Sequence, residues 1–75
     1  MQRAEPLLRL AVSDWLKAGA RVHAAHVRVR LCEALLAMDD IVAAELELSA
    51  AESVFKEVGA EPVLRACESL RARLS

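Results

Sequence analysis

His23 and His26 are the residues of this chain best suited to metal or acid–base chemistry. They lie three residues apart, so a helix would bring both rings to one side. A zinc site needs at least a third ligand, and Cys32 lies about two helical turns further along. The chain has no HExxH, CxxC or calcium-binding loop. We therefore expect no metal and no other cofactor, and we interpret both histidines as polar residues that contact a partner.

Carboxylates and hydroxyls give no better case for catalysis. Glu45 and Glu47 leave a helix in different directions, so they cannot act as an acid–base pair. The serines have no GxSxG motif, and no glycine-rich loop is present to hold a phosphate. The sequence predicts that the protein is not an enzyme and has no catalytic residue.

Charge is unevenly distributed along the 75 residues, although the formal net charge is only −1. Residues 1–31 are mainly basic, whereas residues 32–61 are acidic apart from Lys56. Two interpretations remain open: neighbouring helices neutralise each other within the chain, or faces of opposite sign guide assembly. The arginine-rich segments have no interleaved aromatic residues, so we expect no direct contact with nucleic acid.

The cysteines and the apolar runs indicate the compartment. Cys32 and Cys67 stand among apolar helical residues without a turn-rich disulfide framework, which is typical of buried thiols in a reducing environment. The first residues lack the pattern of a signal peptide, and charged residues interrupt every apolar run. We expect a cytoplasmic protein with no membrane partner.

Helix signals divide the chain into four segments. Pro6 and Pro62 each follow a glutamate and suit the first turn of a helix, where the N–H that proline lacks would be unpaired. Gly19 and Gly59 suit the left-handed position that ends a helix. Between these signals, apolar residues recur at spacings of three and four. We predict one all-α domain over residues 1–75, made of antiparallel helical hairpins with helices at about 6–18, 21–38, 40–58 and 62–74.

The junction between the second and third segments has neither glycine nor proline. Asp39 and Asp40 stand there, and an aspartate can accept the free N–H groups at the start of a helix. This capping chemistry favours a turn, with a kink in one long helix as the alternative.

An internal repeat supports the hairpin arrangement. Self-similarity at a fixed period is typical of helical-hairpin arrays, in which each hairpin exposes an apolar face that the next one covers. A shift of forty residues superposes Leu8, Ala11, Trp15, Gly19 and Ala20 on Leu48, Ala51, Phe55, Gly59 and Ala60.

The second and third segments resemble a tetratricopeptide repeat. Leu31, Cys32 and Leu35 match the large–small–large pattern of its first helix, and Ala44, Leu48 and Ala51 match the small–large–small pattern of its second. Two features depart from that family: Arg28 stands where an aromatic residue is common, and no proline follows Ala51 at the usual distance. We expect the core of the repeat to consist of Leu31, Leu35, Ala44, Leu48, Ala51 and Phe55.

The longer form of this repeat, which closes with AAESVFKEVGAEPVLRACESLRARL, looks like the tetratricopeptide-like region of large ATP-binding LuxR-type bacterial transcription regulators. The resemblance implies a slice of an α-solenoid from a bacterial regulatory protein. It transfers no catalytic residue.

The predicted function is protein–protein interaction or oligomerisation. The candidate partner-binding residues are Trp15, His23, His26, Arg28 and Arg30. We also expect a homodimer, in which a second copy covers the Trp15 side of the first helix and the Val63 and Leu70 side of the last. One alternative is a stand-alone four-helix protein that binds a ligand or metal between its helices, and another is a helical nucleic-acid-binding domain.

Overall fold

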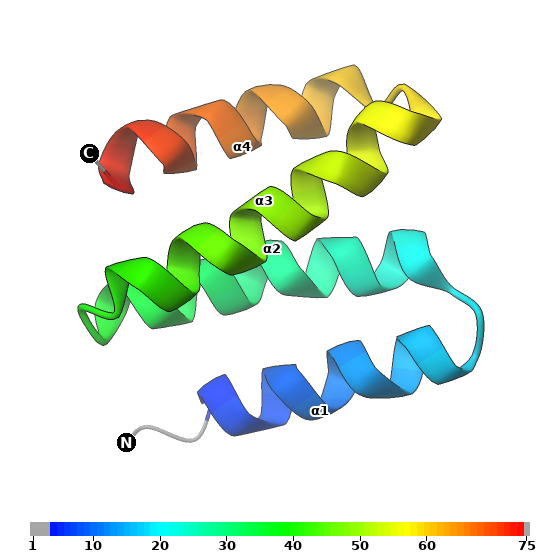
Figure 1. The fold of residues 1–75 in the computed structure, drawn as a ribbon, viewed down its shortest axis with the longest axis horizontal. Helices are drawn as coiled ribbons and strands as arrows, with labels where there is room; N and C mark the ends of the chain where they lie inside the picture. Colours follow the sequence, from blue (N-terminus) through cyan, green and yellow to red (C-terminus); the bar gives the residue numbers. More distant parts are fainter. Residues whose placement is uncertain (1–3, 75) are drawn as a thin grey trace.

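The computed structural model describes residues 4–74 as four α-helices (Figure 1). They are α1 (Ala4–Lys17), α2 (Arg21–Ala37), α3 (Ile41–Val58) and α4 (Glu61–Leu74). Each helix packs against the next one in the sequence and runs antiparallel to it. The predicted all-α fold of helical hairpins is therefore confirmed. None of the described helices is both long enough and apolar enough to cross a membrane.

The four helices form an open array. α1 and α4 lie at opposite edges (Figure 1), and within residues 4–74 the backbone of α1 comes close neither to α3 nor to α4. In a closed four-helix bundle every helix has two neighbours around a shared core. Here α2 and α3 are inner helices, whereas α1 has α2 as its only close backbone neighbour among the described helices.

The three turns share one backbone conformation and lie twenty residues apart. Residues 19, 39 and 59 have positive φ angles of 76°, 63° and 72°. In each turn the amide of the following residue donates to a carbonyl five positions earlier, which is the Schellman arrangement. These hydrogen bonds run from Ala20 to Trp15, from Asp40 to Leu35 and from Ala60 to Phe55, each at 2.9 Å.

The junction at Asp39 is thus a turn rather than a kink. Asp39 adopts the left-handed conformation that glycine supplies in the other two turns. Asp40 then starts α3, and its side chain accepts a hydrogen bond from the Ala43 N–H at 3.3 Å.

A single apolar core connects α2, α3 and α4. All six residues expected in the core of the repeat are buried, with exposed fractions of 1% or less. The small side chains Ala44 and Ala51 are fully buried on α3 beside Leu48 and Phe55. Cys32 and Cys67 belong to the same core and form no disulfide. Burial raises the pKa of both thiols.

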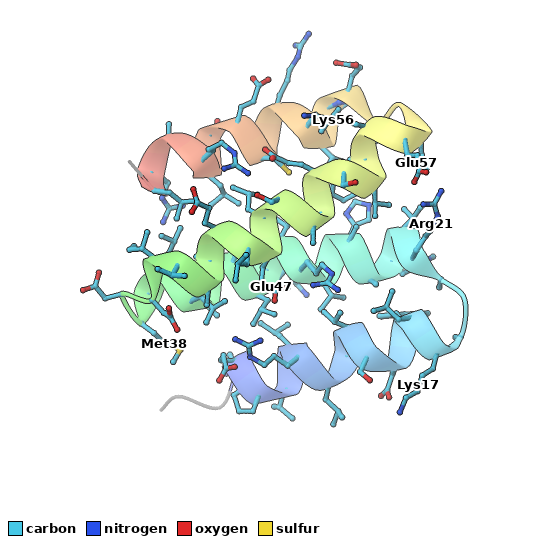
Figure 2. The ribbon with its side chains drawn as sticks, in the orientation of Figure 1. Lys17, Arg21, Met38, Glu47, Lys56 and Glu57 are labelled. Atoms are coloured by element: carbon cyan, nitrogen blue, oxygen red, sulfur yellow. The ribbon has the colours of Figure 1, made fainter. Side chains whose placement is uncertain are left out.

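Acidic residues of α3 pair with arginines of the other helices. Figure 2 shows Glu47 in the middle of α3 and Arg21 facing Glu57 at one end of the hairpin. Arg28 lies 2.7 Å from Glu47, and Arg71 lies 2.6 Å from Glu52. Much of the charge asymmetry along the sequence is therefore neutralised between neighbouring helices, which favours the first of the two interpretations.

Candidate protein-binding groove

A groove of about 680 Å³ opens between α2 and α4, at the end where α1 meets α2. It exists because α2 and α4 both pack on α3 but touch each other only locally. We call it the α2–α4 groove. It is lined by Trp15 of α1, by His23, His26, Val27, Val29 and Arg30 of α2, and by Pro62, Val63 and Ala66 of α4.

Ring contacts fix the polar end of the α2–α4 groove. The turn at Gly19 returns the chain so that Trp15 stacks on His23, with ring centroids 4.6 Å apart and an angle of 27° between the planes. The ring of His26 meets that of Phe55 edge-on at 4.9 Å. Phe55 is fully buried, so His26 is anchored to the core while remaining solvent-accessible. Trp15 is 40% exposed, which is high for so large an apolar side chain.

Among the described residues, the α2–α4 groove carries positive charge and no carboxylate. None of its lining residues is acidic. Arg30 is exposed and forms no ion pair with any of residues 4–74. An apolar floor with aromatic rings and a cation at its rim suits an apolar segment that carries a carboxylate.

The structure brings together four of the five candidate partner-binding residues. Trp15, His23, His26 and Arg30 all line the α2–α4 groove. Arg28 does not join them, because it lies on another face of α2 and is held there by Glu47.

The surface expected to be covered by a second copy is only partly available. Val63 lines the α2–α4 groove near Trp15. Leu70 is 5% exposed and belongs to the core of its own chain. The expectation that Leu70 contacts another chain is therefore wrong, because α4 turns that side chain towards α3.

Sequence reasoning did not select the apolar walls of the α2–α4 groove, which include Val29, Pro62 and Ala66. Val29 lies off the main apolar stripe of α2. An apolar residue outside that stripe was the sequence signal that could have identified this wall of the groove. An inner helix needs apolar residues on more than one side, since it has neighbours on more than one side.

His23 and His26 belong to no metal-binding cluster among the described residues. Among residues 4–74 no group of three or more histidines, cysteines or carboxylates is placed to hold a metal ion. Cys32, considered above as a third ligand, lies in the core.

Comparison of the chain with protein-family models, with curated proteins and with solved structures finds no match.

Proposed function

We propose that this chain is a protein-interaction module of tetratricopeptide-like type, which binds an apolar segment of another protein in the α2–α4 groove. The observation that carries the proposal is the exposed Trp15–His23 stack at the end of a groove with apolar walls. Aromatic residues that combine a large apolar surface with a polar edge are the side chains most often found at the centre of protein interfaces. The open array supports the tetratricopeptide-like type, and the resemblance noted above is the basis on which we propose a place in a cytoplasmic bacterial regulatory protein.

The test uses the position of Ala66, an exposed residue that lines the α2–α4 groove. A photo-crosslinking residue at position 66 should capture a protein partner in the source cells. The same residue at Ala37, which is exposed but does not line the groove, is the matched control.

The captured partner is then titrated against purified protein. Trp15 is the only tryptophan, so its emission reports directly on occupancy of the groove. Ala66→Glu should weaken binding about tenfold or more, because it buries a charge against the partner's apolar segment. Ala37→Glu should bind normally. Equal binding by both variants, or no change in Trp15 emission, would contradict this assignment.

Self-association belongs to the same proposal, with a second copy of the chain docking on the outer side of α1. Leu7 and Leu10 are 64% and 59% exposed there, and among the described helices only α2 packs closely against α1. Identical chains most often pair about a two-fold axis. Sedimentation at micromolar concentration should report a dimer that Leu10→Glu dissociates. Leu46→Glu, at an equally exposed leucine on α3, should leave it intact.

A further inference from the structure

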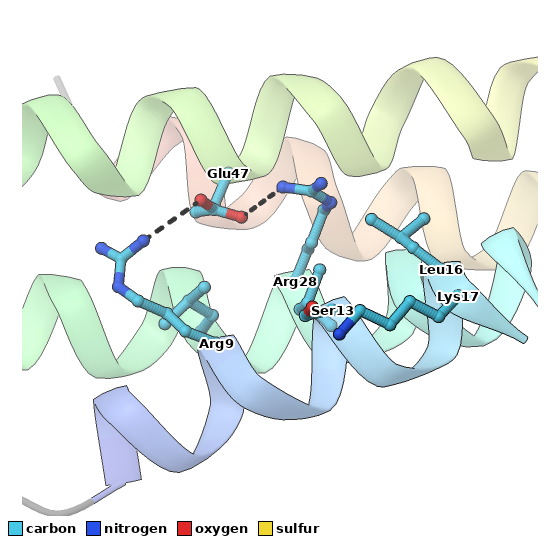
Figure 3. A pocket seen from close by; sticks show the side chains of 8 residues that line it. Arg9, Ser13, Leu16, Lys17, Arg28 and Glu47 are labelled. Atoms are coloured by element: carbon cyan, nitrogen blue, oxygen red, sulfur yellow. Dashed lines mark hydrogen bonds and ion pairs between the residues drawn. The ribbon is translucent and has the colours of Figure 1, made fainter.

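A second pocket lies between α1 and α3, on a different face of α2 from the α2–α4 groove (Figure 3). α1 and α3 both pack on α2, but their backbones do not come close to each other. The space left between them is about 340 Å³. Its apolar floor consists of Val12, Leu16 and Leu31. We call it the α1–α3 pocket.

Cations predominate at the rim of the α1–α3 pocket. Arg9 and Lys17 come from α1 and Arg28 from α2, whereas Glu47 of α3 is the only acidic residue that lines it. Figure 3 shows Arg9 and Arg28 reaching towards Glu47 from opposite sides. Arg28 lies 2.7 Å from one carboxylate oxygen of Glu47, whereas Arg9 lies 3.8 Å from the other, beyond hydrogen-bonding distance. Arg9 is instead hydrogen-bonded to Glu5 of its own helix, so its charge is also neutralised.

Lys17 supplies the unneutralised positive charge. It forms no ion pair with any residue between 4 and 74. Arg9, Ser13 and Lys17 succeed one another at intervals of four, so they form one polar row along α1 above the apolar floor.

Arg28 occupies a position that packing alone would give to an apolar residue. Arg28 precedes the turn at residue 39 by the same number of residues as Leu8 precedes the turn at 19 and Leu48 precedes the turn at 59. The three residues therefore occupy equivalent positions in α2, α1 and α3. Leu48 is fully buried. The Arg28 side chain is 26% exposed and its partner Glu47 only 14% exposed. A partly buried ion pair of this kind is weak evidence for stability, because removing both charges from water is costly. The pair lines the α1–α3 pocket together with Leu31.

We propose that the α1–α3 pocket binds a small monocarboxylate with an unbranched apolar tail. The tail lies on Val12, Leu16 and Leu31, and the carboxylate accepts hydrogen bonds from the Lys17 ammonium and the Ser13 hydroxyl. The cavity lies at the lower end of the range of roughly 300–1,000 Å³ found for small-molecule sites. This volume suits a free small molecule.

The binding test is a calorimetric titration with octanoate below its micellar concentration, with 1-octanol as the uncharged probe of equal length. Octanoate should bind at one site, and 1-octanol at least about tenfold more weakly, because hydrogen bonds to charged groups are the strong ones. Lys17→Gln should reduce octanoate affinity by a similar factor. Lys56→Gln is the matched control, since Lys17 and Lys56 each lie in the last turn of their helix, and it should bind as the unmodified protein does.

A second variant distinguishes loss of the ligand site from loss of the fold. Ser13→Phe should place a large apolar side chain in the space between α1 and α3 and abolish octanoate binding, while the helical circular dichroism remains that of the unmodified protein. Ala66→Glu, in the α2–α4 groove, should leave octanoate affinity unchanged, so that failure of the groove and failure of the pocket are distinguishable. The inference is overturned by the absence of saturable octanoate binding, by equal affinity for 1-octanol, or by undiminished binding in either the Lys17 variant or the Ser13 variant.

Discussion

Ala51 is the residue at which the packing of the array is most directly testable. Its side chain is fully buried on α3, in the core cluster that includes Leu31, Leu48 and Phe55. α3 packs against α2 and α4, so a larger side chain at position 51 has no solvent-facing direction in which to turn. Ala51→Leu inserts three further carbons into this space. Overpacking a core to this extent costs about 1–3 kcal/mol.

The expected change in melting temperature follows from the size of the chain. In a domain of this length, 1 kcal/mol corresponds to about 4–8 °C. A loss of about 2 kcal/mol should therefore lower the midpoint by roughly 8–16 °C. Helix propensity contributes little, because alanine and leucine differ by only a few tenths of a kcal/mol in a helix.

The matched control is the preceding residue. Ala50 is half-buried and does not pack against the core cluster. Ala50→Leu therefore adds the same three carbons to the same helix without overpacking the core. Both variants should be melted by circular dichroism at 222 nm after their helical signal at low temperature has been checked. If Ala51→Leu melts at the same temperature as Ala50→Leu, there is spare room beside Ala51, and the close packing of α3 inferred here is wrong.

Two further predictions concern the thiols and the middle turn. Because burial raises the pKa of Cys32 and Cys67, the folded chain keeps these protons to a higher pH than the unfolded chain, and stability should fall as pH rises above the ordinary thiol pKa of about 8.5. Urea melts at about pH 8 and pH 10 should show a smaller fall for Cys32→Ala/Cys67→Ala, and an unchanged fall would contradict the assignment. Asp40→Ala should cost about 0.5–2 kcal/mol because the Ala43 N–H loses its cap. Asp39→Gly should be neutral or stabilising, since it removes a side chain from a left-handed position; equal losses in thermal melts of both variants would refute the distinction.

The helices were predictable from the sequence because their signals are local. Prolines, glycines and the spacing of apolar residues placed four helices close to the bounds observed. The middle turn was harder, since Asp39 takes the role that Gly19 and Gly59 play in the other turns. That substitution also concealed the shorter period: the sequence repeat is visible at forty residues, whereas the turn geometry recurs at twenty.

The candidate site was less predictable because it depends on which helices are neighbours. Trp15, His23, His26 and Arg30 were selected by residue type, and the groove unites them only through the packing of α2 and α4 on α3. Arg28 has the same residue type as Arg30 and lies two positions away, yet it points to another face. The deciding factor was its pairing with a carboxylate nineteen residues further along the chain, Glu47, which no local pattern announces.

The residue whose carbonyl closes each turn has a different role in the inner helices than in α1. Trp15, Leu35 and Phe55 each accept the hydrogen bond that closes their turn, so they occupy equivalent places in successive helices. Leu35 and Phe55 are buried, at 1% and 0% exposure, because α2 and α3 have close neighbours on more than one side. Trp15 is 40% exposed because, within the described residues, only α2 packs closely against α1. The large apolar side chain at this position therefore fills the core in an inner helix and is an exposed aromatic anchor in α1. The proposed binding surface arises from the position of α1 at the edge of the array rather than from a separate motif.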